Sequence, residues 1–174
     1  MNEKKGNQAP ESKVCDGAEA CRAEEVSLLV RRGIEAGIVK PLLEAFSMQF
    51  GRDRVRELAD EVIRSIAREQ GDKLARQYGS RSLTSFLRCV EMWKSGGALE
   101  IQMLEQSDER LSINVTRCRF AEVYAEMGLG DLGVVLSCNR DFALIEGFNP
   151  RIALERKHTI MEGAPYCDLR FSLR

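Results

Sequence analysis

The sequence predicts an α+β fold in which N-terminal helices precede two β-hairpins that form a four-stranded antiparallel sheet packed on helices. Two observations support this prediction. Apolar residues recur at helical spacing from about residue 22 to residue 97, and beyond residue 97 two stretches alternate apolar with polar residues. We therefore expect a single domain over 22–174, with a helical part over 22–97 and a sheet part carrying the site over 98–174.

Residues 1–21 are polar and low in aromatics, which predicts a disordered leader. The remaining length is enough to bury one core, since the whole chain has 174 residues and is 44% apolar. Its formal net charge is -1 with both signs interleaved, which disfavours a nucleic-acid partner. No apolar run reaches the roughly 18 residues of a membrane span, and the N-terminus lacks the apolar stretch of a secretory signal. We expect a cytoplasmic protein without a membrane partner.

The helical part contains three apolar stripes, which predict amphipathic helices with their apolar sides toward the core. The first stripe consists of Val26, Leu29, Val30, Ile34 and Ile38, and resumes after Pro41 with Leu42, Leu43, Phe46 and Phe50. The second consists of Val55, Leu58, Val62 and Ile66. The third consists of Leu83, Phe86, Leu87, Val90 and Trp93. Pro41 should interrupt or kink the first helix, and the third should begin at the N-cap Ser82 and end at Gly96.

The sheet part begins with a hairpin, whose strands of alternating residues over 99–103 and 111–115 flank a turn at 107–109. A short helix follows over 120–127 and ends at Gly128. Residues 129–137 fit either more helix or a buried strand. A second hairpin over 151–160 and 166–173 completes the predicted sheet.

The second hairpin places polar groups among apolar ones. By strand parity, Arg156 and His158 share a face with Ile152, and Cys167 lies on the inward face of the partner strand. One register that fits this parity sets His158 against Leu169. A guanidinium, an imidazole and a thiol would then line an inner pocket. The alternative is that Arg156 and His158 lie at a frayed strand end and reach solvent.

The chain contains six cysteines and a single histidine. The cysteines are Cys15, Cys21, Cys89, Cys118, Cys138 and Cys167. Because no pair is spaced as CxxC, common zinc patterns are absent. Cys89 borders the third helical stripe and should be a packed, inert thiol. Cys138 precedes Asp141 by three residues at an expected helix start, where the helix N-terminus and Arg140 would lower the pKa of the thiol. Cys118 opens the preceding helix in a similar way.

Glycine-rich phosphate loops and the GxSxG motif are missing, and we expect no cofactor. Three cysteine-bearing blocks instead resemble the L-2-amino-thiazoline-4-carboxylate hydrolase family over residues 112–171. The blocks are NVTRCRFAEVYAEMGLGDLG, CNRDFALIEGFNP and LERKHTIMEGAPYCDLRF. The matched positions are Cys118, Cys138, Asp141, Phe142, Asn149, Pro150, Arg156, Thr159, Gly163, Cys167 and Asp168. Lys157 and Leu169 depart from the family pattern, which usually has a threonine and an aromatic residue there.

The resemblance implies a hydrolase that opens a thiazoline ring, acting on a carbon–nitrogen bond of a cyclic amidine that bears a carboxylate. A thiolate suits attack on the amidine carbon. We assign Cys138 or Cys167 as the nucleophile, and Asp141 and His158 to proton transfer. Arg156 would hold the substrate carboxylate. Cys118 and Asp168 complete the expected site for a small-molecule substrate, and self-association of the chain is left open.

Two other functions fit the same residues. Cys118, Cys138 and Cys167 could bind a soft metal or an organometal, with Asp141 as a proton donor. Alternatively, the protein could have a structural or interaction role in which the thiols are simply buried.

Overall fold

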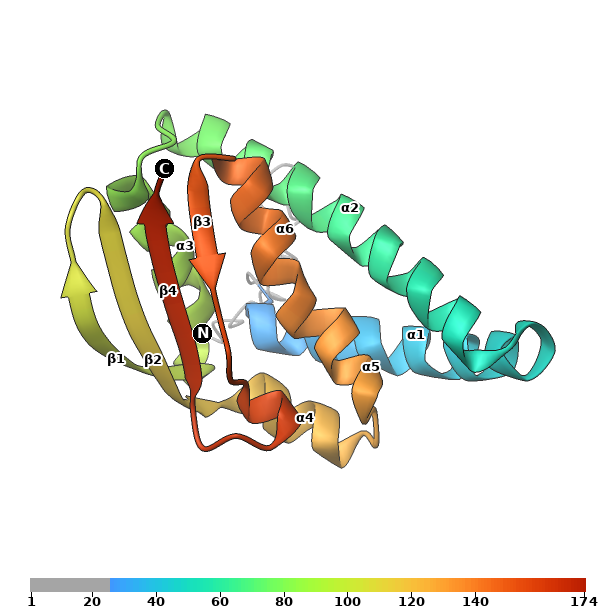
Figure 1. The fold of residues 1–174 in the computed structure, drawn as a ribbon. Coiled ribbons are helices and arrows are strands. Elements are labelled where there is room, and N and C mark those ends of the chain that lie inside the picture. Colours follow the sequence, from blue (N-terminus) through green and yellow to red (C-terminus); the bar gives the residue numbers. More distant parts are fainter. Residues whose placement is uncertain (1–25) are drawn as a thin grey trace, which may run out of the picture.

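The computed structural model describes residues 26–174 (Figure 1). The predicted leader, Cys15 and Cys21 lie outside the described residues. The three expected N-terminal helices are α1 (Leu28–Phe50), α2 (Arg52–Tyr78) and α3 (Leu83–Lys94). None of these helices, nor any other helix of the described part, is long and apolar enough to cross a membrane.

Helices α1 and α2 form an antiparallel hairpin that extends away from the sheet (Figure 1). The Ser27 side chain caps α1 by accepting the Val30 N–H at 3.3 Å. The helix continues through Pro41 and ends at Gly51, whose φ of 87° turns the chain into α2. The predicted interruption at Pro41 is therefore wrong.

Most residues of the two apolar stripes in this hairpin do not face the core, and only Leu29 of the first stripe and Val55 of the second are buried. Besides Leu29, the buried residues of α1 are Arg32 and Ala36. We call the exposed set the hairpin face, and each of its side chains belongs to a residue between 40 and 65% exposed. The hairpin face consists of Val30, Ile34, Ile38, Leu42, Phe46 and Phe50 from α1 and Leu58, Val62 and Ile66 from α2. The helices were predicted correctly, but their orientation was not. The side of α1 that packs inward carries the small residue Ala36, and the side with most of the large apolar residues is exposed.

Helix α3 matches its prediction closely. Ser82 caps it by accepting the Ser85 N–H at 3.0 Å, and the helix gives way to a 3-10 turn before Gly96 reverses the chain at a φ of 67°. Its apolar side is buried, and Cys89 packs there without exposed surface.

The sheet is antiparallel in the order β1-β2-β4-β3, so the predicted α+β class is confirmed. Its strands are β1 (Leu99–Gln106), β2 (Arg110–Cys118), β3 (Ile152–Glu155) and β4 (Cys167–Leu173). Core residues come from α3, α6 and the inward positions of β2 and β4.

A helical segment joins the two hairpins. It consists of α4 (Arg119–Glu126), α5 (Asp131–Gly133), a π-helical turn (Val134–Cys138) and α6 (Asn139–Phe148). Residues 131–137 are therefore helical, and the alternative of a buried strand is wrong. Helix α6 crosses α2 at two glycines: a Cβ atom at Gly71 would lie 2.0 Å from the Leu144 carbonyl oxygen, and one at Gly147 would lie 2.0 Å from the Arg68 carbonyl oxygen. This close contact fixes α6 against α2.

The second hairpin has the predicted parity but a different register. Leu154 pairs with Phe171, whereas the expected register, which set His158 against Leu169, would place Arg156 there. Strand β3 ends at Glu155, so His158 lies beyond the strand. On β4, Cys167, Leu169 and Phe171 are buried as expected.

Candidate functional site

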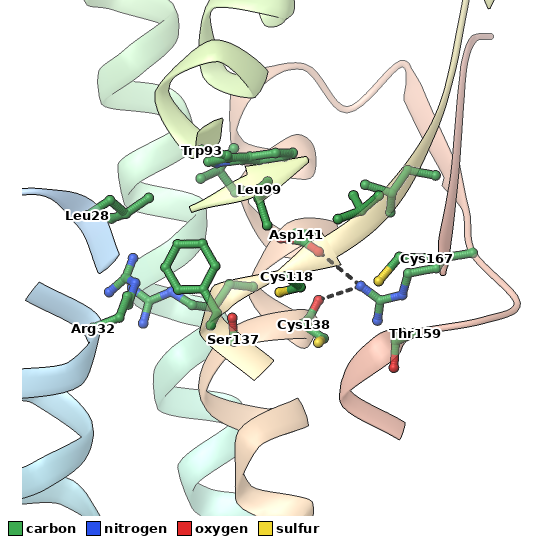
Figure 2. Close-up of a pocket in the computed structure, with 16 residues that line it drawn as sticks. Leu28, Arg32, Trp93, Leu99, Cys118, Ser137, Cys138, Asp141, Thr159 and Cys167 are labelled. Carbon is green, nitrogen blue, oxygen red and sulfur yellow. Dashed lines mark hydrogen bonds and ion pairs between the residues drawn. The ribbon is translucent and has the colours of Figure 1, made fainter. Parts of the chain in front are cut away.

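A cavity of about 100 Å³ lies between the inner face of the sheet, α6 and the start of α1 (Figure 2). Apolar side chains such as Trp93, Phe120 and Leu169 form much of its wall. The charged and nucleophilic lining residues are Arg32, Cys118, Ser137, Cys138, Arg140, Asp141, Arg156, Thr159 and Cys167. The space suits one small molecule, and the apolar wall with a few polar groups is typical of ligand sites.

Three thiols predicted for the site line this one cavity. Cys118 ends β2 and is the N-cap residue of α4, as expected. Cys138 is the last residue of the π-helical turn that leads into α6, and Cys167 is the first residue of β4. Figure 2 shows the three cysteines and Asp141 grouped together.

The thiols are not activated in the way the sequence suggested. Burial raises the pKa of Cys118 to about 11, against the opposing effect of the Phe120 and Ala121 N–H groups. Burial first, and then the Asp141 carboxylate, raise the pKa of Cys138. Burial also raises the pKa of Cys167, although its sulfur accepts the Ile160 N–H at 3.2 Å.

The expected lowering of the Cys138 pKa is therefore wrong, for a geometric reason. Cys138 has α-helical backbone angles and follows helical residues from Asp131 onward, so it does not lie at a free helix N-terminus. The helix dipole favours an anion only at the first turn of a helix. At Cys138, loss of hydration dominates instead.

Asp141 and Arg156 form an ion pair at the centre of the cavity wall (Figure 2). Arg156 Nη1 donates to Asp141 Oδ2 at 3.0 Å and to the Cys138 carbonyl oxygen at 2.8 Å. The Arg156 side chain is 7% exposed, and its guanidinium lies 4.8 Å from the centre of the Phe142 ring. Burial raises the pKa of Asp141 to about 6, even though Arg156 and Arg140 oppose that shift.

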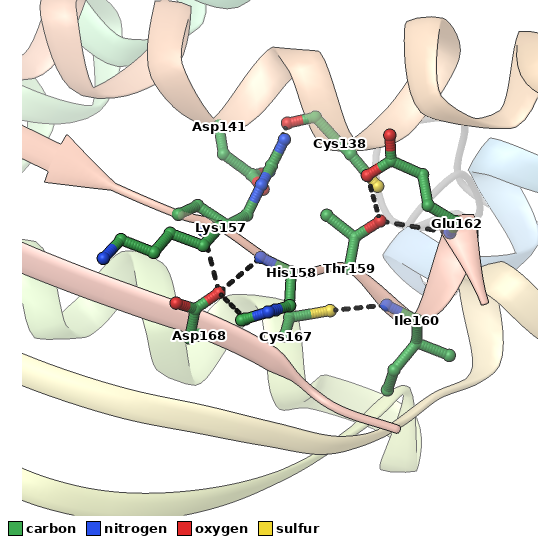
Figure 3. A network of polar contacts seen from close by, with 10 residues as sticks. Cys138, Asp141, Lys157, His158, Thr159, Ile160, Glu162, Cys167 and Asp168 are labelled. Carbon is green, nitrogen blue, oxygen red and sulfur yellow. Dashed lines mark hydrogen bonds and ion pairs between the residues drawn. The ribbon is translucent and has the colours of Figure 1, made fainter. Parts of the chain in front are cut away.

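His158 and Asp168 are not among the residues that line the cavity. Figure 3 shows the polar contacts around them. The His158 side chain is 53% exposed, with Nδ1 3.5 Å from Asp168 Oδ1. The same oxygen accepts the N–H groups of Lys157 at 2.9 Å and His158 at 2.6 Å. Burial opposes ionisation, but these N–H groups leave the pKa of Asp168 below its ordinary value. The inward orientation expected for His158 is wrong because β3 ends three residues earlier, and Asp168 anchors the segment after β3.

Three further residues line the cavity that the sequence did not assign to the site: Arg32, Arg140 and Thr159. Arg140 was considered only for its effect on Cys138, and Thr159 only as a matched family position. Thr159 is buried, and its hydroxyl donates to Glu162 Oε2 at 2.7 Å (Figure 3). Arg32 comes from α1 and Arg140 from α6. A signal for Arg32 was present, since Leu29, Arg32 and Ala36 follow helical spacing on one side of α1. For Arg140 the signal was its position between Cys138 and Asp141 in the second cysteine-bearing block.

The metal alternative receives no support from the geometry. Within residues 26–174, no three His, Cys, Asp or Glu side chains are arranged to hold a metal ion. The three thiols share the cavity without forming such a cluster.

The sequence profile of L-2-amino-thiazoline-4-carboxylic acid hydrolase matches residues 31–171, a longer region than the three cysteine blocks. Among curated proteins, no sequence matches this chain significantly. Among solved structures, the chain is similar to the crystal structure of the phenol-responsive sensory domain of the transcription activator PoxR with phenol. The identity is 13%, the TM-score is 0.48, and the match covers 84% of this chain and 76% of that chain. A likeness at this level supports no argument about function.

Proposed function

Because this chain belongs to the L-2-amino-thiazoline-4-carboxylic acid hydrolase family, we propose that it is a thiol-dependent hydrolase of a small cyclic amidine that bears a carboxylate. The observation that carries the proposal is the convergence of Cys118, Cys138, Cys167 and Asp141 on one cavity. A partly buried carboxyl group with a pKa of about 6 is mostly ionised at neutral pH and can accept a proton from a thiol.

Cys138 is the proposed nucleophile. Asp141 follows it by three residues in a helical segment, and residues at this spacing lie on the same side of a helix. The raised pKa keeps Cys138 protonated until substrate binds, so attack requires a base beside it. Arg156 holds the Asp141 carboxylate in place through its 3.0 Å contact, and is thus a positioning residue. Cys167 remains the alternative nucleophile.

The proposed reaction proceeds in two stages. Cys138 Sγ bonds to the amidine carbon, the electron pair of the C=N bond moves to the ring nitrogen, and Asp141 passes the thiol proton to that nitrogen. The ring carbon–nitrogen bond then breaks, and the nitrogen leaves as an amine after taking a second proton from the exocyclic amino group. Water adds to the same carbon and releases the Cys138 thiol. The net reaction consumes one water molecule.

The test is turnover of 2-aminothiazoline-4-carboxylate, followed by mass spectrometry as the gain of one water. Cys138→Ala should lower kcat/KM by at least about a hundredfold, the scale of losing a nucleophile or its base. Cys89→Ala is the matched control, because Cys89 is buried outside the cavity. Full activity in Cys138→Ala with loss in Cys167→Ala would transfer the role to Cys167. Full activity in both variants would contradict a thiol mechanism.

A further inference from the structure

The cavity has a second charged wall, made by Arg32 and Arg140. Their side chains are only 11% and 8% exposed. Figure 2 shows Arg32 on the other side of Cys138 from Cys167. Both arginines line the same cavity as Cys138 and Asp141, and their charges oppose the rise of the Asp141 pKa.

The positive charge of this wall is incompletely compensated. Arg32 Nη1 donates to Glu35 Oε2, and Arg140 Nη1 lies 3.9 Å from the same oxygen. Arg140 Nη2 donates to the neutral Gln70 side chain at 3.3 Å. Within residues 26–174, no other carboxylate lies within 4 Å of either guanidinium. Arg156, by contrast, forms its ion pair with Asp141, which no other arginine or lysine of this region contacts within 4 Å. Two cations therefore share one partly exposed carboxylate.

A buried cation without a full counter-charge is unfavourable, and burial together with the charge of Arg32 lowers the pKa of Arg140 to about 10. An anion that enters the cavity would supply the missing negative charge beside Arg32 and Arg140. Guanidinium groups bind carboxylates through paired, charge-assisted hydrogen bonds.

We infer that Arg32 and Arg140 bind the carboxylate of the substrate. This inference rests on the proposed function and reassigns the role that the sequence suggested for Arg156. A carboxylate held at this wall places the rest of a small ring toward Cys138 and Asp141. The pair would thus determine specificity for anionic over neutral amidines.

The test uses two ligands that the enzyme cannot open, thiazole-4-carboxylate and its carboxamide, with binding measured by calorimetry. The wild type should bind the carboxylate at least about tenfold tighter than the carboxamide, because hydrogen bonds between two charged groups are stronger than those to a neutral amide. Arg140→Gln and Arg32→Gln should each remove most of this preference. Arg68→Gln, at an exposed arginine that pairs with Glu146, is the control.

The variants Arg140→Lys and Arg32→Lys keep the charge and guard against loss of folding. They should fold and bind the carboxylate with intermediate strength. Equal binding of both ligands by the wild type, or an unchanged preference in the Gln variants, would overturn the inference. A clear carboxylate preference without turnover of 2-aminothiazoline-4-carboxylate would contradict the proposed function and leave this inference standing.

The hairpin face supports a second, independent inference. Its residues on α1 follow one another at a spacing of four, so the apolar strip turns by about 40° around the helix at each step. It continues on α2, on the hairpin that extends from the sheet in Figure 1. Its nine residues are each 40 to 65% exposed, and together their exposed area is on the order of the ~800 Å² per partner of a standard interface. Soluble monomers rarely leave so large an apolar area uncovered.

We propose that the hairpin face pairs with the same face of a second copy. Two antiparallel hairpins related by a twofold axis would bury both faces in a closed dimer. Charge does not oppose this, because the net charge is only -1 and charges on α2 are paired within one chain, as in Asp60–Arg64 and Arg54–Glu57.

Light scattering after size exclusion should give twice 19.6 kDa at micromolar concentration. Ile38→Glu should give a folded monomer, because it places two charges in the proposed interface. Leu104→Glu, at an exposed apolar residue of β1, should remain dimeric. A wild type that stays monomeric up to about 100 μM, or an Ile38→Glu variant that still dimerises, would overturn the proposal.

Discussion

Arg156 and Asp141 are joined by a 3.0 Å contact that ties the segment after β3 to the first turn of α6. The same Nη1 atom also donates to the Cys138 carbonyl oxygen, so one guanidinium nitrogen links two parts of the helical segment. The counter-charge of this buried arginine is thus an internal carboxylate. A substrate carboxylate is not required to satisfy it.

Arg156→Lys should therefore lower the stability of the protein. The shorter ammonium group loses the geometry that reaches both oxygen atoms, and we expect a loss of about 1–3 kcal/mol in the free energy of unfolding. Urea denaturation measures this change. Arg68→Lys, at an exposed ion pair, should cost less than about 1 kcal/mol. Unchanged stability together with weaker ligand binding would return Arg156 to a role in substrate binding.

Asp141 should make stability fall as the pH rises from about 4 to about 6. Its pKa is about 6 in the folded protein against an ordinary value of 3.8, so the folded state binds more protons than the unfolded state in this window. The stabilisation that Asp141 contributes is fully present below pH 3.8 and is lost as the pH rises to about 6. Above that pH it no longer changes. Asp141→Asn lacks this dependence. Its stability relative to the wild type, measured by urea denaturation at pH 4 to 7, should therefore increase with pH; a constant difference would contradict the raised pKa.

The cavity thiols should react slowly with iodoacetamide near pH 7 and faster as the pH approaches 10. Burial raises the pKa of Cys118, Cys138 and Cys167, and only the thiolate reacts. Peptide mapping of the labelled protein gives the rate at each site. Cys89 is an internal reference, with a pKa raised to about 11. Rapid labelling of Cys138 at pH 7 would instead support the activated thiolate that the sequence suggested.

The two glycines at the α2–α6 crossing should not tolerate a side chain. Gly71→Ala or Gly147→Ala would place a methyl group 2.0 Å from a backbone oxygen, and we expect a loss of about 3 kcal/mol or more. Gly33→Ala in α1 is the matched control. Its Cβ atom would lie 3.9 Å from Val123, an ordinary contact, and stability should stay the same or rise by up to about 1 kcal/mol. Thermal unfolding of the three variants distinguishes a tight crossing from a loose one.

The sequence predicted the elements better than their orientation. Periodicity identifies a helix and its apolar side, but it does not say what covers that side. In α1 most of the bulky stripe, including Ile34, is exposed, while its member Leu29 packs inward beside Arg32 and Ala36. An apolar stripe that forms a surface between molecules has the same pattern as one that forms a core.

The sequence predicted the positions of site residues on strands, where the alternation of inward and outward side chains decides their orientation. Parity placed Cys167 inward correctly, because alternation depends only on the local backbone. The orientation of His158 depended on where β3 ends, which alternation alone does not give. The thiol pKa values depend on burial by distant segments, such as the effect of Asp141 on Cys138, and this requires the assembled fold.

The glycine crossing between α2 and α6 also constrains the length of the chain. Each residue added to a helix rotates everything beyond it by about 100°. After the insertion of one residue between Asp141 and Leu144, Cys138 and Asp141 could still face the cavity, or Gly147 could still contact α2. The helix could not keep both contacts at once. The count of residues from Cys138 to Gly147 is therefore part of the site, and this stretch of α6 should accept substitutions at exposed positions while rejecting insertions and deletions of any single residue.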